Sequence, residues 1–252
     1  MSVTPCLRLE SVSRHFGGLK AVDEVTLTLQ RGERRALIGP NGAGKTTLFN
    51  VVSGEARPTA GRIRLFGEDI TRLAPHQRAA RGIARTFQIT KLFGELTVFE
   101  NLLLACEALD PRKFTVYRSL LSYADLVSTA NALLAGFGLE RLREEQARNL
   151  SYGDQRKLEV ALSMAGKPRL LLLDEPMAGL SSAESRSMLA LLRQLDPTTA
   201  VLLIEHDMDI AFGFAESVTV LSQGRVIAEG HRDEISANPD VQEIYLGVHL
   251  ES

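Results

Sequence analysis

The sequence of 252 residues contains only two cysteines, Cys6 and Cys106. They lie far apart in the chain and in no spacing typical of a metal site or a redox pair. This excludes a disulfide framework of the kind that holds small secreted domains together. We interpret both cysteines as buried or idle thiols of a protein from a reducing compartment.

Long hydrophobic runs are also absent. The apolar stretches, such as residues 170–173 and 200–204, are short, whereas a membrane-spanning helix needs roughly 20 such residues. The first ten residues lack the charged segment and apolar core of a secretory signal. If the protein serves a membrane process, we expect it to be a peripheral protein at the cytoplasmic face of the inner (plasma) membrane, held there by partner proteins.

An excess of positive charge is the third missing feature. The chain has 29 Lys and Arg against 31 Asp and Glu, a net charge of −2. A surface that follows nucleic-acid phosphates needs a basic excess, so we expect no nucleic-acid partner, although a neutral total can contain a local basic patch. The 44% of hydrophobic residues is typical of a globular protein with an ample core.

The hydrophobic pattern predicts an α/β protein. Apolar and polar residues alternate in the first 30 residues, which indicates strands. The mainly apolar segments at 35–39, 170–173, 201–204 and 218–221 indicate buried strands. The stretch from about 90 to 165 instead has the spacing of amphipathic helices.

This change of pattern predicts a core that is interrupted by an insert. We assign residues 1–88 and 165–252 to an α/β core and residues 89–164 to a helical subdomain. Repeats, low-complexity tracts and a long linker are all missing from the sequence. We expect the two ends of the chain to belong to the same core.

Residues 39–46, Gly-Pro-Asn-Gly-Ala-Gly-Lys-Thr, match the phosphate-loop pattern G-x-x-x-x-G-K-[ST] in full. Glycines allow successive backbone N–H groups to surround phosphate oxygens, and the helix that follows adds its positive dipole end. Lys45 is expected to reach the β- and γ-phosphates, and the Thr46 hydroxyl to bind Mg²⁺. A glycine-rich turn could match by chance, but the predicted strand before it and helix after it argue against that. The candidate nucleotide-binding residues here are Gly39, Pro40, Asn41, Gly42, Ala43, Gly44, Lys45, Thr46 and Thr47.

Two acids, Asp174 and Glu175, follow the apolar run at 170–173. Ligands of such sheets bind beyond the carboxyl ends of the strands, so both acids should face the phosphates. We expect Asp174 to hold the Mg²⁺ shell and Glu175 to polarise an attacking water. The alternative is that Asp174 and Glu175 simply form a solvated turn after a core strand. The presence of a phosphate loop in the same chain argues against this alternative.

A phosphate loop alone fits kinases, GTPases and many ATPases. Residues 150–155, Leu-Ser-Tyr-Gly-Asp-Gln, precede the strand that ends in Asp174 and Glu175. They resemble the LSGGQ signature of ATP-binding cassette (ABC) ATPases. Gln88 resembles the Q-loop of that family, His206 its switch histidine, and Phe16 the aromatic residue that stacks on adenine. The resemblance covers nearly the whole chain.

This resemblance implies a fold and several roles. The fold is a RecA-like phosphate-loop core with an N-terminal antiparallel β subdomain and an inserted helical subdomain. Ser151 and Gly153 would contact the γ-phosphate of an ATP held by an opposite subunit. Gln88 would touch the Mg²⁺, His206 would assist Glu175, and a pair of subunits would enclose the nucleotides.

Each of these residues also has a simpler interpretation. Phe16 could be a core residue of its strand, and His206 an ordinary surface histidine. Ser151 with Asp154 also forms the pattern of a helix cap, which is compatible with a phosphate contact.

Three residues depart from the general pattern of the family. Tyr152 replaces a signature glycine and Asp154 a glutamine, and we expect the Asp154 charge to point away from a phosphate. In this family an aspartate usually stands at the position of Ser181, in a segment called the D-loop. Whether Ser181 makes the contact across the dimer that the D-loop aspartate makes is therefore left open. Ser181 with Glu184 instead predicts a capping box.

The sequence around Tyr152 and Asp154, residues 150–159, is similar to the ATPase subunits of branched-chain amino acid and urea importers. Residues 16–22, 82–88, 92–98 and 244–247 resemble the same group, and related lipopolysaccharide-export ATPases look alike. The resemblance implies hydrolysis of Mg-ATP that drives import of a hydrophobic amino acid or a urea-like amide. Its partners would be separate transmembrane permease subunits, a second identical or homologous ATPase subunit and, indirectly, a periplasmic binding protein. The alternatives are the ATPase of another ABC transporter, such as a lipopolysaccharide exporter, an ABC ATPase outside transport, and a phosphate-loop kinase.

Overall fold

The computed structural model describes residues 4–86, 92–108, 110 and 120–246. The chain forms two compact units. The first unit comprises Met1–Ile83, Arg169–Glu175 and Leu195–Ser252, and the second comprises Ala84–Pro168 and Pro176–Gln194. The helical subdomain predicted at residues 89–164 lies within the second unit, which also takes in the segment Pro176–Gln194. The subdomain boundaries stay a prediction.

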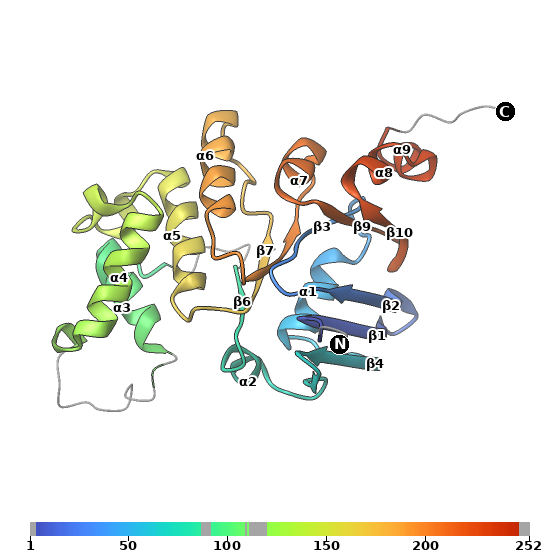
Figure 1. Ribbon diagram of the computed structural model, residues 1–252, viewed down its shortest axis with the longest axis horizontal. Coiled ribbons are helices and arrows are strands. Elements are labelled where there is room, and N and C mark those ends of the chain that lie inside the picture. Colours follow the sequence, from blue (N-terminus) through green and yellow to red (C-terminus); the bar gives the residue numbers. More distant parts are fainter. Residues whose placement is uncertain (1–3, 87–91, 109, 111–119, 247–252) are drawn as a thin grey trace. The chain divides into compact units, whose positions relative to one another are not determined.

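The first unit contains an antiparallel sheet near the N-terminus. Its strands are β1 (Leu7–Phe16), β2 (Leu19–Leu29), β4 (Ala60–Leu65) and β5 (Glu68–Asp69), in the order β2-β1-β4-β5. Leu9 of the central strand β1 lies opposite Leu27 on one side and Ile63 on the other. All three side chains are buried, because alternate residues of these strands point into the core. Figure 1 shows β1, β2 and β4 side by side.

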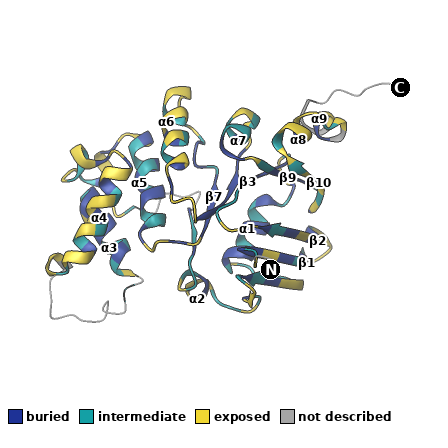
Figure 2. Cartoon of the chain, viewed as in Figure 1, coloured by how far each residue is buried: buried dark blue, intermediate teal, exposed yellow. Residues whose placement is uncertain are grey.

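A second sheet has the order β10-β9-β3-β8-β7-β6. Its strands are β3 (Arg34–Ile38), β6 (Ile83–Arg85), β7 (Leu170–Asp174), β8 (Ala200–Ile204), β9 (Ser217–Ser222) and β10 (Arg225–His231). β3 runs parallel to both β8 and β9, and β7 runs parallel to β8. All residues of β7 and β8 are buried, as Figure 2 shows for β7, which explains the continuous apolar runs at residues 170–173 and 200–204.

Helix α1 (Lys45–Ser53) belongs to the core that both sheets share. Its residues Leu48, Phe49, Val51 and Val52 are buried in one hydrophobic cluster with residues of β1, β2, β4, β7 and β8. The other helices of this unit are α2 (Pro75–Ala79), α7 (Met208–Phe214), α8 (Arg232–Ser236) and α9 (Pro239–Leu246). The helix that follows the phosphate loop is thus held along its length by apolar contacts.

The second unit is helical. Its helices are α3 (Val98–Ala108), α4 (Ala124–Gly136), α5 (Tyr152–Met164) and α6 (Ser182–Arg193), with short 3-10 helices at Leu120–Ser122, Glu140–Leu142 and Ala147–Asn149. α3 packs on α4 and on α5, and buried residues such as Leu102, Ala130 and Leu158 form their apolar faces. In the part of the chain that the structure describes, a helix with the length and hydropathy to cross a membrane does not occur.

Candidate functional site

The phosphate-loop residues form a tight turn between β3 and α1. Gly44 precedes α1 with a φ of 101°, and a Cβ atom there would lie 2.2 Å from the backbone oxygen of Ala21. At Gly39, directly after β3, a Cβ atom would lie 2.1 Å from the backbone oxygen of Leu221. A side chain at either position would push the loop away from β2 or β9, so both glycines are needed for this close approach.

Lys45 begins α1 and its side chain is buried. Its Nζ donates hydrogen bonds to the carbonyl oxygens of Gly39 at 2.6 Å and Pro40 at 3.0 Å. Burial lowers the pKa of Lys45 below its ordinary value, and the carboxylates of Glu175 and Asp174 act in the opposite direction. The ammonium is therefore a poorly hydrated cation, which an anionic phosphate group would stabilise.

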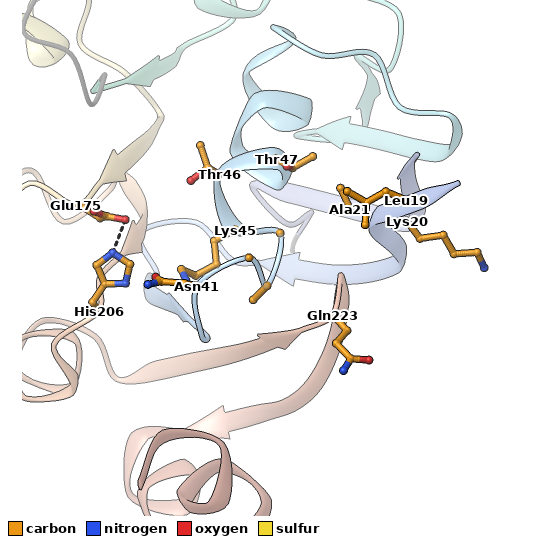
Figure 3. A pocket seen from close by; sticks show the side chains of 13 residues that line it. Leu19, Lys20, Ala21, Asn41, Lys45, Thr46, Thr47, Glu175, His206 and Gln223 are labelled. Atoms are coloured by element: carbon orange, nitrogen blue, oxygen red, sulfur yellow. Dashed lines mark ion pairs between the residues drawn. The ribbon is translucent and has the colours of Figure 1, made fainter. Parts of the chain in front are cut away.

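Glu175 and His206 meet because β7 and β8 are parallel and in register. Asp174 lies opposite Ile204, and the backbone N–H of Glu175 donates to the oxygen of Ile204 at 3.0 Å. Both side chains then leave the same edge of the sheet, and His206 Nε2 lies 2.7 Å from Glu175 Oε1 (Figure 3). Glu175 has a φ of +50°, a backbone conformation uncommon for residues with a side chain and enriched at functional sites.

An open cavity of about 560 Å³ lies over the phosphate loop. This volume is within the range of small-ligand sites. The cavity is lined by Leu19, Lys20, Ala21, Asn41, Gly42, Ala43, Gly44, Lys45, Thr46, Thr47, Glu175, His206 and Gln223 (Figure 3). The structure thus brings most of the predicted phosphate loop together with Glu175 and His206.

Hard oxygen ligands are available for a magnesium ion. Thr46 lines the cavity with its hydroxyl group, and Asp174, at the end of β7, is buried beside Glu175. Among the described residues, no group of three or more His, Cys, Asp or Glu side chains could hold a metal by itself. Mg²⁺ commonly binds through one or two protein ligands, substrate phosphates and waters. The donors Thr46 and Asp174 fit that mode of binding.

Four lining residues were not predicted from the sequence: Leu19, Lys20 and Ala21 of β2, and Gln223 of the β9–β10 turn. Backbone hydrogen bonds fix this turn to the loop, from Gly224 N to Ala43 O at 3.0 Å and from Asp23 N to Gly224 O at 2.9 Å. The dipeptide Gln223-Gly224 predicts a turn, but its local sequence carries no signal that it lies beside the phosphate loop.

An ion pair reinforces the same junction. Arg225, the first residue of β10, donates from Nη2 to Asp23 Oδ2 at 2.6 Å. Hydrogen bonds from Arg225 and then from Lys20 hold the pKa of Asp23 below its ordinary value. Asp23 is therefore charged and paired at neutral pH, and it keeps the β9–β10 turn against β2.

Phe16 lies at the end of β1 and is 50% exposed. The alternative that it is a core residue is therefore wrong. Its ring lies 4.3 Å from the guanidinium carbon of Arg14, and it is not among the cavity-lining residues. Stacking on adenine stays a prediction. Gln88 lies outside the described residues.

Ser151 and Gly153 belong to the second unit. Ser151 is the N-cap of α5, as predicted, and its Oγ accepts from the Asp154 N–H at 3.2 Å and donates to Asp154 Oδ2 at 2.7 Å. Burial alone would raise the pKa of Asp154, but hydrogen bonds from Ser151 and Lys157 hold it below its ordinary value. The predicted capping box of Ser181 with Glu184 is likewise present at the start of α6.

Comparison with known proteins identifies the family. The model of the ABC transporter family matches residues 22–178, and that of the branched-chain amino acid ATP-binding cassette transporter matches residues 225–251. The high-affinity branched-chain amino acid transport ATP-binding protein LivG of Escherichia coli is 41% identical over 96% of this chain and 98% of its own length.

Solved structures agree with this result. The ADP conformation of an ATP-binding cassette of an ABC transporter superposes with a TM-score of 0.86 and 31% identity, over 97% of this chain and 99% of that one. A dimeric cassette in a post-hydrolysis state with ADP and Pi gives a TM-score of 0.75 and 26% identity, over 90% and 98%. The predicted fold is thereby confirmed. The chain belongs to the ABC transporter family, as an ATP-binding and ATP-hydrolysing protein of the branched-chain amino acid transporter group.

Proposed function

We propose that this chain hydrolyses ATP with Glu175 and His206 on nucleotide held by its phosphate loop, and that hydrolysis drives amino-acid import through separate membrane subunits. The observation that carries the proposal is the 2.7 Å contact between His206 Nε2 and Glu175 Oε1 at the wall of the phosphate-loop cavity. The contact with His206 fixes the orientation of the Glu175 carboxylate. A group that orients an attacking water needs such a fixed orientation.

The reaction is the transfer of the γ-phosphoryl group to water. A water oriented by Glu175 attacks the γ-phosphorus, the bond to the bridging oxygen of ADP breaks, and the water gives up a proton, so that ADP, phosphate and a proton leave. Lys45 neutralises charge on the β- and γ-phosphates, and the loop N–H groups donate to their oxygens. A neutral imidazole has one N–H, so His206 donates either to Glu175 or, as the family resemblance implies, to the γ-phosphate.

Mg²⁺ would be held by the Thr46 hydroxyl and by Asp174, with Gln88 as a further ligand by family resemblance. When bound, the ion neutralises phosphate charge and favours the departure of ADP. Asp174 serves this role because it is buried at the end of a rigid strand, and Thr46 because it sits in the first turn of α1. Phe16 would cover the adenine.

We further propose that a complete site needs two subunits. Ser151 and Gly153 of one subunit would contact the γ-phosphate of an ATP bound to Lys45 of the other. The dimeric structure of a similar cassette bound to ADP and Pi supports such pairing. The second subunit can be identical or homologous.

The transported compound is a branched-chain or other hydrophobic amino acid, or a urea-like amide. The name of LivG and the family match at residues 225–251 support the amino acid. Permease subunits would hold this chain at the cytoplasmic face of the membrane, and a periplasmic binding protein would act indirectly through them. The chain has no nucleic-acid partner in this function.

The test is Glu175→Gln, which keeps the size of the side chain and removes its negative charge. We expect ATP affinity to be kept and steady-state phosphate release to fall by at least about 100-fold, as for loss of a general base. Glu216→Gln, an exposed acid before β9, is the matched control and should behave as wild type. Normal turnover by the Glu175 variant would refute its assignment.

A further inference from the structure

The departure from the family pattern at Tyr152 has a structural counterpart in the second unit. Tyr152 begins α5 directly after the N-cap Ser151. Its hydroxyl donates to the backbone oxygen of Ala178 at 3.0 Å. The glycine that usually stands in this position could not make this bond, since it has no side chain.

Arg156 completes the contact. One turn further along α5, its Nε and Nη2 donate to Tyr152 Oη at 3.0 and 2.7 Å, and its Nη1 donates to Glu159 at 2.9 Å. A phenol has one proton to donate and lone pairs to accept, and here both capacities are used. The hydroxyl is therefore fully hydrogen-bonded although the residue is 45% exposed.

The Ala178–Ser181 segment has a shape that fits this side chain. Gly179 has a φ of +78°, and a Cβ atom there would lie 3.0 Å from Tyr152 Cε1. Any other residue would strain the backbone and displace the ring. The ring thus packs on a position that only glycine fills without cost.

A second contact joins the same two segments. A Cβ atom at Gly153 would lie 2.5 Å from Glu184 Oε1, so the missing side chain makes room for this carboxylate. Glu184 Oε2 in turn accepts from the N–H of Ser181 at 2.9 Å and from its Oγ at 2.6 Å. Two adjacent signature residues therefore touch the start of α6 and the loop before it.

We propose that Tyr152 is a positioning residue that ties the signature loop to the Ala178–Ser181 segment of the same chain, so that the two move as one body. The inference rests on the proposed function for its catalytic meaning. Ala178 follows Glu175 by three residues, at most roughly 10 Å of extended chain. Contact of Ser151 with a partner's ATP is thereby passed to the chain segment next to the subunit's own Glu175.

Tyr152→Phe tests the tie in the full chain, because it removes the hydroxyl and keeps the ring. Thr129→Val, which removes a hydroxyl that donates to the backbone of its own helix α4 at 2.9 Å, is the control. We expect amide hydrogen exchange of residues 177–181, measured without nucleotide, to become about 2- to 12-fold faster. This factor corresponds to the free energy of one neutral hydrogen bond. We expect kcat to fall by a similar factor, with calorimetric ATP affinity unchanged, because the Lys45 side of the site is intact.

Arg156→Lys supplies a second test, since it keeps the positive charge beside Glu159 and loses the fork on Tyr152. Added to Tyr152→Phe, it should give no further loss, because both changes break one unit. The proposal would be overturned if the loss of kcat in the double variant equalled the product of the two single losses. It would also be overturned if residues 177–181 of Tyr152→Phe exchanged at the wild-type rate. A loss of kcat that merely follows a lower melting temperature would overturn it as well. If Glu175→Gln keeps its turnover, the catalytic assignment fails, whereas the exchange result still decides the tie.

Discussion

At the scale of single residues, we expect Lys45 to determine how tightly the nucleotide is held. Its ammonium is buried against two backbone carbonyls and near two acids. We expect Lys45→Ala to weaken ATP binding by about 1.5–3 kcal/mol, the value of a hydrogen bond to a charged group, which is about 10- to 150-fold in Kd. Isothermal titration measures this. Unchanged affinity would mean that the loop N–H groups and the α1 dipole suffice without the cation.

Replacing Phe16 tests whether its ring contacts the adenine of the bound nucleotide. Because its ring is half exposed, truncation to alanine should leave folding stability nearly unchanged. If the ring stacks on adenine, ATP affinity should fall by about 1–3 kcal/mol. Thermal melting and titration of the same sample separate the two effects. A drop in melting temperature with normal affinity would argue against stacking.

The two cysteines should be chemically inert in the folded protein. Burial raises the pKa of Cys6 to about 12 and that of Cys106 to about 11, so neither thiol carries a reactive thiolate at pH 8. We expect iodoacetamide to label neither residue in the native protein and both in denaturant, as seen by mass spectrometry. Rapid native labelling of either would show local opening around that thiol.

At the scale of elements, Arg78 of α2 holds the far end of α1. It is fully buried and donates to the backbone oxygens of Val51 and Val52 at 2.7 and 2.8 Å, and to those of Leu73 and Thr71 at 3.0 Å each. These are carbonyls that a helix end or a turn leaves open.

We therefore expect Arg78→Met to cost about 3 kcal/mol or more of unfolding free energy, because buried carbonyls lose their donors. Arg81→Met is the control from the same region, since its ion pair with Glu68 at 2.8 Å is exposed, and it should cost less than about 1 kcal/mol. Urea denaturation compares the two. Equal losses would show that Arg78 is not the cap of α1.

The elements also show what the sequence can and cannot predict. Strands such as β7 and β8, and helices such as α1 and α4, were predicted because continuous apolar runs or helical spacing mark them locally. The short elements β6, α2 and α7 were missed, because three, five and seven residues carry too little periodicity. The contact of Glu175 with His206 was expected from the family resemblance, whereas the tie of Gln223-Gly224 to Ala43 depends on the β3–β9 pairing, which no local pattern encodes.

At the scale of the whole molecule, the proposed composite site makes activity depend on subunit pairing. ATP should strengthen the pair, since its γ-phosphate adds contacts on both sides that ADP lacks. We expect the ATPase rate per molecule of the purified chain to rise with protein concentration until dimers saturate.

A mixture of Lys45→Ala and Ser151→Ala chains should regain part of the lost activity, because one intact composite site forms in each mixed dimer. Each variant alone serves as the control. Constant specific activity in a dilution series that light scattering shows to be monomeric would contradict pairing.

The strand order of the large sheet has a consequence for how this protein is made. β3, which ends at Ile38 and leads into the phosphate loop, lies between β8 and β9, which begin at Ala200 and Ser217. On a ribosome that adds about 5–20 residues per second, the loop waits roughly 10 to 30 s for its neighbours to be synthesised. A nascent chain that stops before Ala200 should therefore not retain ATP, however complete its phosphate-loop motif.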